Sequence, residues 1–289
     1  MSLKPRRSVL YLPGSNARAL EKARTLEADG LILDLEDAVA PDAKQTARRQ
    51  VVTAVGEGGF GNREVVIRVN GLDTPWGGDD LAAVATAGAD AVLLPKVSAP
   101  DEVLAAVARL DEAGGPADLP LWIMAETPRG ILESHAIAGA HPRLAVVVMG
   151  TSDLAKELRL PARGDRLGLL AALSHCLLAA RAHGLEILDG VHLDLGDEAG
   201  LTAACEQGRD LGFDGKTLIH PRQLAAANRV FAPAMDTVER SRRIIHAWTE
   251  ARDQGRGVVV VDGRLVENLH VEEARRVLAL HDAISALGW

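Results

Sequence analysis

Short apolar runs alternate along the chain with longer amphipathic segments. Most runs are nearly continuous in Val, Ile and Leu, which is typical of parallel strands that are buried on both faces. The pattern predicts eight such strands. They are Ser8–Pro13, Gly30–Glu36, Glu64–Asn70, Ala91–Val97, Pro120–Glu126, Ala145–Gly150, Glu186–His192 and Gly215–Pro221.

The segments between these runs have helical spacing and helix-terminal signals. Pro41–Val55 and Ala99–Ala113 begin at or next to a proline followed by Asp, and Leu167–Gly184 is rich in Ala and Leu and ends in glycine. Both signals are common at helix ends. Eight strand–helix units predict an α/β fold, the TIM (β/α)8 barrel, for which about 250 residues is typical. The competing fold is an open doubly wound sheet, which usually has fewer strands and a phosphate-binding first turn.

The pattern changes after Pro233. Residues 236–255 predict a helix, residues 257–266 predict a β-hairpin around Asp262 and Gly263, and residues 267–289 predict a last helix. Asp-Gly is a favoured pair for a tight hairpin turn. We therefore predict a catalytic barrel over residues 1–233. Residues 234–289 would form a small α/β segment that acts as a lid or as an arm for oligomerisation.

Composition and charge narrow the classes of partner. The chain has 289 residues, of which 47% are hydrophobic and only 3% aromatic, and its net charge is -8. Without a basic stripe or base-stacking aromatic residues, nucleic acid is not an expected partner. No apolar run reaches the ~20 residues of a membrane span, and the N-terminal run is too short for a signal peptide. We therefore expect a cytoplasmic protein whose Cys176 and Cys205 are buried free thiols.

Polar residues follow the predicted strands at their carboxyl ends, where the active sites of TIM barrels lie. Glu126 ends the fifth strand, and Asp153 follows the sixth. Neighbouring strands are ~4.8 Å apart, so the two carboxylates can reach one cation. Two carboxylates with waters and substrate oxygens suit Mg²⁺. In the structural alternative, Asp153 caps the next helix and Glu126 bonds a loop amide.

Further residues at these strand ends are candidates for substrate binding. Arg68 completes an apolar run and needs an anion, which is a substrate group or, equally, the carboxylate of Glu36 or Asp37. Lys96 either forms a Schiff base or, as we favour, an ion pair. The turn after the sixth strand offers backbone N–H groups at a helix start to a carboxylate. Its candidate residues are Gly150, Thr151, Ser152 and Leu154.

Motifs along almost the whole chain follow one order. They are "RRSVLYLPGSN", "LILDLEDAVAP", "VVIRVNGLDTPWGGDDL", "VLLPKV", "IMAETPRGI", "VVMGTSDLAKEL", "DGVHLDLGDEAGL" and "GFDGKTLIHPRQL". Together they resemble the citrate lyase beta-subunit-like family of the HpcH/HpaI aldolase superfamily, which also includes malyl-CoA and citramalyl-CoA lyases. The resemblance implies a TIM barrel with a C-terminal lid that assembles into homotrimers or hexamers.

The resemblance also implies roles for individual residues. Mg²⁺ would be held by Glu126 and Asp153, Arg68 would contact the substrate, and Glu36 and Asp37 would lie in the outer shell of the metal. CoA would lie across the mouth of the barrel with its thioester end facing the metal.

One motif departs from the family pattern. Family lyases commonly carry "G-x-M-V/I-D" in the C-terminal hairpin, and that Asp reaches the active site of a neighbouring subunit. The run here is "GRLVEN", so Glu267 stands in its place. Glu keeps the carboxyl group but adds a methylene, and acid–base catalysis depends on geometry.

The expected function is Mg²⁺-dependent carbon–carbon cleavage of a malyl-, citramalyl- or citryl-type 3-hydroxyacyl-CoA. The products are acetyl-CoA and a 2-oxo acid, and the reverse condensation uses the same groups. Arg68 would stabilise charge on the thioester oxygen, Glu267 would protonate the enolate carbon, and Glu36 and Asp37 would support them. The alternatives are an aldolase for CoA-free acids, a subunit that acts only within a citrate lyase complex on an acyl-carrier thioester, and a non-catalytic binder.

Overall fold

Eight parallel strands close into a barrel. The structure is a computed structural model that describes residues 4–161, 164–255 and 257–289. Each strand pairs with the next along the chain and β8 pairs with β1, which confirms the predicted TIM-barrel class. The strands are β1 Ser8–Pro13, β2 Gly30–Asp34, β3 Glu64–Arg68, β4 Ala91–Leu94, β5 Leu121–Ala125, β6 Leu144–Met149, β7 Glu186–Asp189 and β8 Gly215–Leu218.

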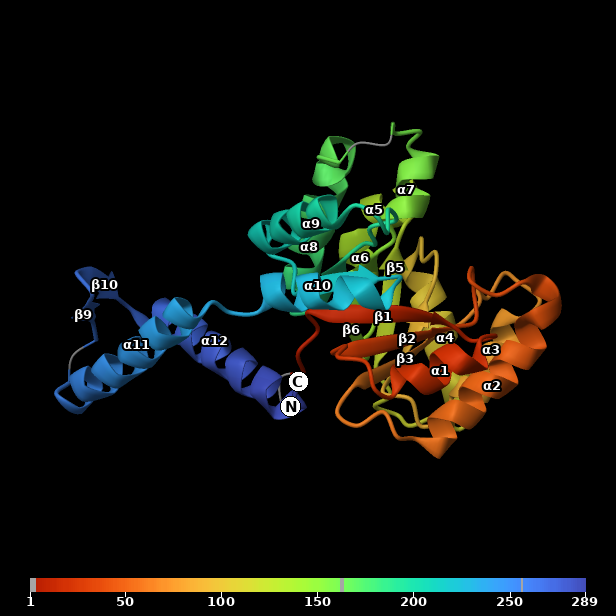
Figure 1. Cartoon of the computed structure of the whole chain (residues 1–289), viewed down its shortest axis with the longest axis horizontal. Coiled ribbons are helices and arrows are strands. Elements are labelled where there is room, and N and C mark those ends of the chain that lie inside the picture. Colours follow the sequence, from red (N-terminus) through yellow and green to blue (C-terminus); the bar gives the residue numbers. More distant parts are fainter. Residues whose placement is uncertain (1–3, 162–163, 256) are drawn as a thin grey trace. The chain divides into compact units, whose positions relative to one another are not determined.

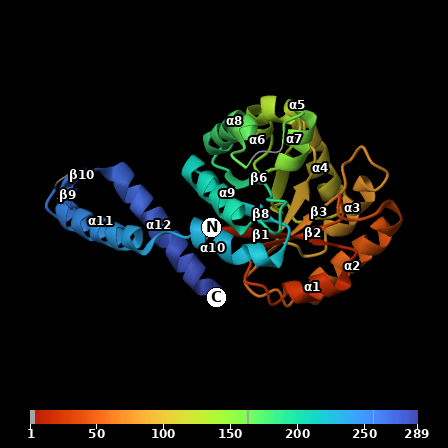
Figure 2. The ribbon, with the colours of Figure 1, turned by 45° about the horizontal axis from the view of Figure 1, so that its top comes forward.

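Helices lie around the outside of the strands (Figure 1, and turned in Figure 2). They are α1 Ala17–Ala23, α2 Lys44–Glu57, α3 Gly77–Val84, α4 Pro100–Glu112, α5 Pro128–Leu132, α6 Ser134–Ala138, α7 Thr151–Glu157, α8 Leu170–Ala182, α9 Glu198–Leu211 and α10 Leu224–Phe231. Short 3-10 turns at Pro41–Ala43, Leu167–Leu169 and Pro221–Gln223 lead into α2, α8 and α10. Within the described ranges, no helix combines the length and apolarity of a membrane-spanning segment.

β1 has the predicted bounds, whereas the other seven strands end earlier than the apolar pattern predicts. β2 ends at Asp34 instead of Glu36, and β3 ends at Arg68 instead of Asn70. The strand hydrogen bonds of β2 stop at this point, because the N–H of Glu36 donates to the side chain of Asp34 at 2.9 Å and not to a neighbouring strand. The residues beyond are loops, and their polar side chains gather at the carboxyl ends of the strands.

Side chains alternate between two apolar layers along each strand. The interior cluster includes Val9, Ile32, Val66, Leu93, Trp122, Val148 and Leu188. The strand residues of opposite orientation pack against the helices in a larger cluster. On β1, Val9 and Tyr11 belong to the interior, whereas Leu10 and Leu12 belong to the outer layer. Tyr11 therefore lies inside the barrel, nearer than Val9 to the carboxyl ends of the strands.

The described residues form two compact units, Arg6–Phe231 and Ala232–Trp289, and the second also includes Lys4 and Pro5. The second unit contains α11 Met235–Asp253, β9 Val259–Val261, β10 Arg264–Val266 and α12 Asn268–Leu287. Its strands are antiparallel and turn at Asp262 and Gly263, whose φ angles of 50° and 73° are those of a tight hairpin turn. Trp248, Val266 and Val271 lie in a separate apolar core within this unit.

Candidate functional site

The carboxyl ends of the strands surround a pocket of about 790 Å³ that is partly open to solvent. Its lining includes seven residues predicted from the sequence: Asp37, Arg68, Glu126, Gly150, Thr151, Ser152 and Asp153. The apolar side chains of Met149, Val191 and Ile219 also line it. The barrel therefore brings most of the predicted residues together in one cavity.

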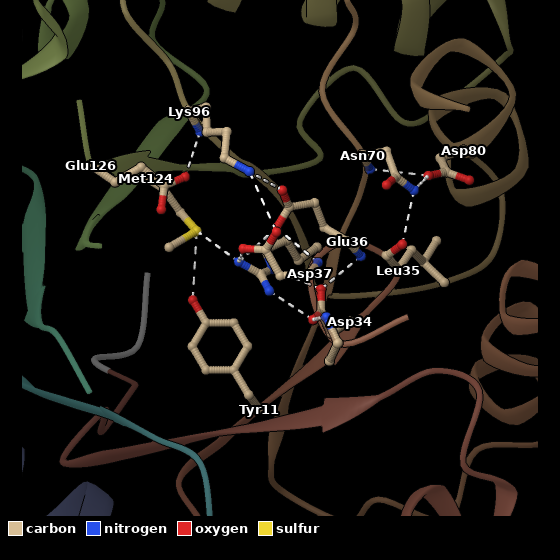
Figure 3. Close-up of polar contacts among 12 residues, drawn as sticks. Tyr11, Asp34, Leu35, Glu36, Asp37, Asn70, Asp80, Lys96, Met124 and Glu126 are labelled. Atoms are coloured by element: carbon tan, nitrogen blue, oxygen red, sulfur yellow. Dashed lines mark hydrogen bonds and ion pairs between the residues drawn. The ribbon is translucent and has the colours of Figure 1, made fainter. Parts of the chain in front are cut away.

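Glu126 directly follows β5 and is 1% exposed. Its Oε1 accepts the backbone N–H of Lys96 at 2.7 Å (Figure 3), whereas Oε2 is buried and has no hydrogen-bond partner among the described residues. Burial raises the pKa of Glu126 to about 7, and the negative charge of Asp153 contributes to the rise. A buried carboxylate oxygen without a partner is costly, so this arrangement favours a bound cation at Oε2.

Asp153 completes a pair of carboxylates that fits Mg²⁺. It lies in the first turn of α7 and is not the helix cap of the structural alternative, because the N-cap residue is Gly150. In the part of the chain that the structure describes, no three or more His, Cys, Asp or Glu side chains form a metal-binding group. Mg²⁺ needs fewer protein ligands, because it keeps waters and takes substrate oxygens. Zn²⁺ fits less well, because it prefers three or four protein ligands.

Gly150 provides the space that Glu126 occupies. A Cβ atom at position 150 would lie 2.3 Å from both Cβ and Oε2 of Glu126. The φ angle of Gly150 is an ordinary -89°, so the position requires glycine for close approach and not for backbone freedom. The absence of a side chain at Gly150 therefore allows the carboxylate of Glu126 to lie where it does.

We expect Gly150→Ala to weaken Mg²⁺ binding by about 10- to 100-fold, which is the usual cost of disturbing the support of a metal ligand. Isothermal titration calorimetry with MgCl₂ measures the effect. Gly78→Ala is the matched control, because a Cβ atom at position 78 in α3 would meet nothing within 4 Å. Equal Mg²⁺ affinity in the Gly150 variant and the unchanged protein would contradict the packing argument.

Arg68 is buried at the end of β3, and its main partner is Asp34. Its Nε and Nη2 donate to Oδ1 and Oδ2 of Asp34, each at 2.7 Å, which is a bidentate pair. Its Nη1 lies 3.1 Å from Glu36 and 3.8 Å from Asp37, the two partners that the sequence suggested. The strand register explains the difference, because Asp34 lies directly opposite Arg68 on β2.

The carboxylate of Asp34 has four donors. Besides the two nitrogens of Arg68, Oδ1 accepts the N–H of Glu36 at 2.9 Å and Oδ2 accepts the N–H of Ala38 at 3.1 Å. Charge-assisted hydrogen bonds of this kind offset the cost of burying a carboxylate. Asp34 therefore fixes both the arginine and the loop that follows β2.

Lys96 connects the other acidic residues of the mouth. Its amine forms ion pairs with Glu36 and, at 3.5 Å, with Asp37, while its backbone N–H holds Glu126 (Figure 3). Its φ angle of 54° lies in the left-handed region, which non-glycine residues rarely adopt. Burial alone would lower the pKa of Lys96, but the bond to Glu36 and the neighbouring carboxylates raise it above its usual value. The amine is therefore a paired cation, which agrees with the ion-pair alternative and not with a Schiff base.

The structure at the start of α7 removes Leu154 from the predicted substrate-binding residues. The N–H of Leu154 donates to Gly150 O at 3.1 Å, so the amides of Thr151 and Ser152 precede the hydrogen bonds of the helix. The side chain of Leu154 is 1% exposed and packs in the outer apolar cluster. Leu154 therefore offers neither its N–H nor its side chain to a substrate, because both are used by the fold.

Glu267 lies in the C-terminal unit. It is exposed, directly follows β10 and is the N-cap residue of α12, and its N–H donates to Nδ1 of His270 at 3.1 Å. The exposed position fits a carboxylate that acts outside its own unit. Its acid–base role stays a prediction.

The sequence reasoning missed Tyr11, Met124 and Lys44. Tyr11 and Met124 line the pocket although the pattern places them in core strands, and the alternation along β1 could have indicated Tyr11. Lys44 is buried at the start of α2, where its amine donates to two carbonyls after β2 and to Oδ1 of Asn70 at 2.7 Å. A lysine at a helix start gives no sequence signal of burial.

Known proteins resemble this chain over most of its length. The family model described as HpcH/HpaI aldolase/citrate lyase matches residues 7–221. A protein named (3S)-malyl-CoA thioesterase from Cereibacter sphaeroides (strain KD131 / KCTC 12085) is 56% identical over 282 residues, which is 98% of this chain and 96% of the relative. The citrate lyase subunit beta of Escherichia coli (strain K12) is 38% identical over 279 residues, which is 95% of this chain and 92% of the relative.

Solved structures are similar to this chain in fold as well. CitE from Mycobacterium tuberculosis, in complex with magnesium, acetoacetate and coenzyme A, has a TM-score of 0.74 and 28% identity, covering 95% of this chain and 97% of that one. A citrate lyase from Burkholderia xenovorans LB400 has a TM-score of 0.82 at 17% identity, covers 99% of this chain and 94% of that one, and shows the fold alone. The chain belongs to the HpcH/HpaI aldolase/citrate lyase family.

Proposed function

We propose that this chain is a Mg²⁺-dependent enzyme that hydrolyses a malyl-CoA-type thioester to the free hydroxy acid and CoA. The observation that carries the proposal is the 56% identity, over 98% of the chain, with a relative named (3S)-malyl-CoA thioesterase. The mouth of the barrel supports it, since two carboxylates and an arginine line the same pocket. We also propose that the enzyme is cytoplasmic and acts as a homotrimer or hexamer.

Each group in the mouth has a role in this proposal. Glu126 and Asp153 would hold Mg²⁺, using the partnerless Oε2 of Glu126. When bound, the ion acts as a Lewis acid toward the hydroxyl and carboxylate oxygens of the substrate and orients them. Nη1 of Arg68, which Asp34 does not engage, stabilises the charge that develops on the thioester oxygen. Lys96 keeps Glu126 and the acidic residues beside Arg68 in place.

Carbon–carbon cleavage of the same thioester is the second candidate, and the family match favours it. The 38% identity with a citrate lyase subunit supports this reaction. The hydroxyl group would lose its proton and the C2–C3 bond of the acyl group would break, so that C3 and its carboxylate leave as a 2-oxo acid. Glu267 of a neighbouring subunit would protonate the remaining acetyl-CoA enolate on carbon. In hydrolysis the same carboxylate would take a proton from water. Glu267 is one methylene longer than the Asp that lyases commonly carry, and acid–base catalysis depends on geometry, so this difference weakens the case for carbon–carbon cleavage.

The products distinguish the two reactions. We expect purified protein with Mg²⁺ and (3S)-malyl-CoA to release one free thiol and one malate for each thioester consumed. Carbon–carbon cleavage would give acetyl-CoA and a 2-oxo acid with no free thiol. Thiol titration, a phenylhydrazone assay for the oxo acid and chromatography of the CoA species measure all the products, and citramalyl- and citryl-CoA extend the panel.

The remaining alternatives give different outcomes in the same assay. A subunit that needs a citrate lyase complex would act on an acyl-carrier thioester and not on free CoA thioesters. A CoA-independent aldolase would cleave a free 4-hydroxy-2-oxo acid. A binder would bind Mg²⁺ without turning over any of these compounds. Each outcome would contradict the proposed hydrolysis.

A further inference from the structure

Tyr11 places a phenol in the pocket with a weak partner. The residue lies inside the barrel on β1 and lines the cavity. Its hydroxyl lies 3.7 Å from Sδ of Met124, a contact that Figure 3 shows. A thioether is a weak hydrogen-bond acceptor. An oxygen atom that enters the pocket would therefore be a better partner for this hydroxyl.

A second donor is directed at the same sulfur. Nη1 of Arg68 lies 3.4 Å from Sδ of Met124 and 3.1 Å from a carboxylate oxygen of Glu36, while the other two nitrogens of the guanidinium are bound to Asp34. The guanidinium carbon of Arg68 also lies 4.8 Å from the centroid of the Tyr11 ring. One phenolic donor and one cationic donor thus converge on one point in the wall of the pocket.

We propose that Tyr11 is a catalytic residue, and that its hydroxyl and Nη1 of Arg68 together bind the thioester oxygen of the substrate. This inference rests on the proposed function, because it requires a thioester. In hydrolysis that oxygen becomes the oxyanion of a tetrahedral adduct, and in carbon–carbon cleavage it becomes an enolate oxygen. Either anion accepts hydrogen bonds more strongly than the thioether does. The Tyr11 hydroxyl and the N–H that Nη1 directs at Met124 therefore favour the transition state over the resting site, while Glu36 still pairs with Nη1.

Tyr11 acts as a hydrogen-bond donor in this role and transfers no proton. Burial raises the pKa of the phenol above its usual range, although the charge of Arg68 works in the opposite direction. The hydroxyl therefore keeps its proton at neutral pH. The hydrogen bond strengthens as the oxygen gains charge and weakens again when the product forms.

Tyr11→Phe tests the proposal, because it removes the hydroxyl and keeps the ring beside Arg68. We expect kcat to fall about 100-fold, which is typical for the loss of one oxyanion donor. KM and the calorimetric Mg²⁺ affinity should stay close to those of the unchanged enzyme, because the hydroxyl is proposed to act mainly on the transition state. A Tyr11→Phe variant with unchanged kcat would overturn the inference.

A second measurement uses the fact that Tyr11 is the only tyrosine in the chain. Growth on 3-fluorotyrosine labels this position alone, and the ¹⁹F resonance reports on the phenol. We expect a saturable shift when a malyl-CoA analogue with CH₂ in place of the thioester sulfur is added to the enzyme with Mg²⁺. Binding of the analogue, measured by calorimetry, without a ¹⁹F shift would overturn the role of Tyr11.

The two proposals fail in different ways. If the unchanged enzyme turns over none of the thioesters, the proposed function is wrong and the role of Tyr11 is wrong with it. If the unchanged enzyme is active and Tyr11→Phe is equally active, only the role of Tyr11 is wrong. A lower unfolding temperature of Tyr11→Phe with kcat unchanged would assign the hydroxyl to stability instead of catalysis.

Discussion

Glu126→Gln is expected to abolish Mg²⁺ binding and to lower kcat/KM by about 1000-fold or more. A catalytic metal contributes several kcal/mol to transition-state stabilisation, and about 1.4 kcal/mol corresponds to a factor of ten in rate. The amide has nearly the same size and can still accept the N–H of Lys96, which binds Oε1 in the structure. Calorimetry with MgCl₂ and steady-state kinetics measure the two effects.

The stability of the metal-free protein gives this substitution an independent readout. Since burial raises the pKa of Glu126 to about 7, the folded metal-free protein loses stability as pH rises from the usual carboxyl range through about 7. Glu126→Gln removes this cost, so at pH 8 the variant should be at least as stable as the metal-free unchanged protein. Glu133→Gln is the control, because Glu133 is exposed and makes no capping hydrogen bond. Normal Mg²⁺-dependent activity in Glu126→Gln would exclude the proposed metal role.

Arg68→Met is expected to lower the free energy of unfolding by about 3–5 kcal/mol, because it leaves the buried carboxylate of Asp34 without its cation. Activity should fall by about 100- to 1000-fold as well, because the thioester oxygen loses a donor. Urea unfolding and steady-state kinetics measure the two effects. Arg109→Met is the control, since Arg109 is exposed and its contact with Glu112 is a loose 3.8 Å surface pair.

A double variant distinguishes the contribution of Arg68 to stability from its contribution to catalysis. Asp34→Asn combined with Arg68→Met removes both charges, so it should recover part of the lost stability. Activity should stay low, because the donor at Nη1 is still absent. Recovery of activity together with stability would mean that Arg68 only supports the fold.

The fold could be predicted because its strongest signals are local. Parallel strands buried on both faces appear as apolar runs such as Val65–Ile67 and Ala91–Leu94, and each is followed by a segment with helical signals. The ends of the strands could not be predicted in the same way. Whether Glu36 continues β2 depends on the side chain of Asp34, which takes the N–H of Glu36 out of the ladder.

The location of the candidate site could be predicted from the sequence. The contacts between its residues could be predicted only in part. The fold places the residues after each strand at one mouth, which brings Glu126 and Asp153 together. The partner of Arg68 depends on strand register, and the space for Glu126 depends on Gly150. Both are relations between distant segments, so neither can be derived from the spacing of one motif.

Asp34 and Glu126, two of the buried acids of the mouth, differ in how many further hydrogen bonds or metal contacts their oxygens can accept. A carboxylate has room for about four hydrogen bonds or metal contacts. Asp34 is saturated by protein donors, whereas Glu126 has a single protein donor and an oxygen with vacant lone pairs. The saturated acid has no affinity left for a ligand, however close it lies to one. The number of donors around each buried acid thus predicts that Asp34 supports the fold and that Glu126 can bind a cation, without reference to any relative.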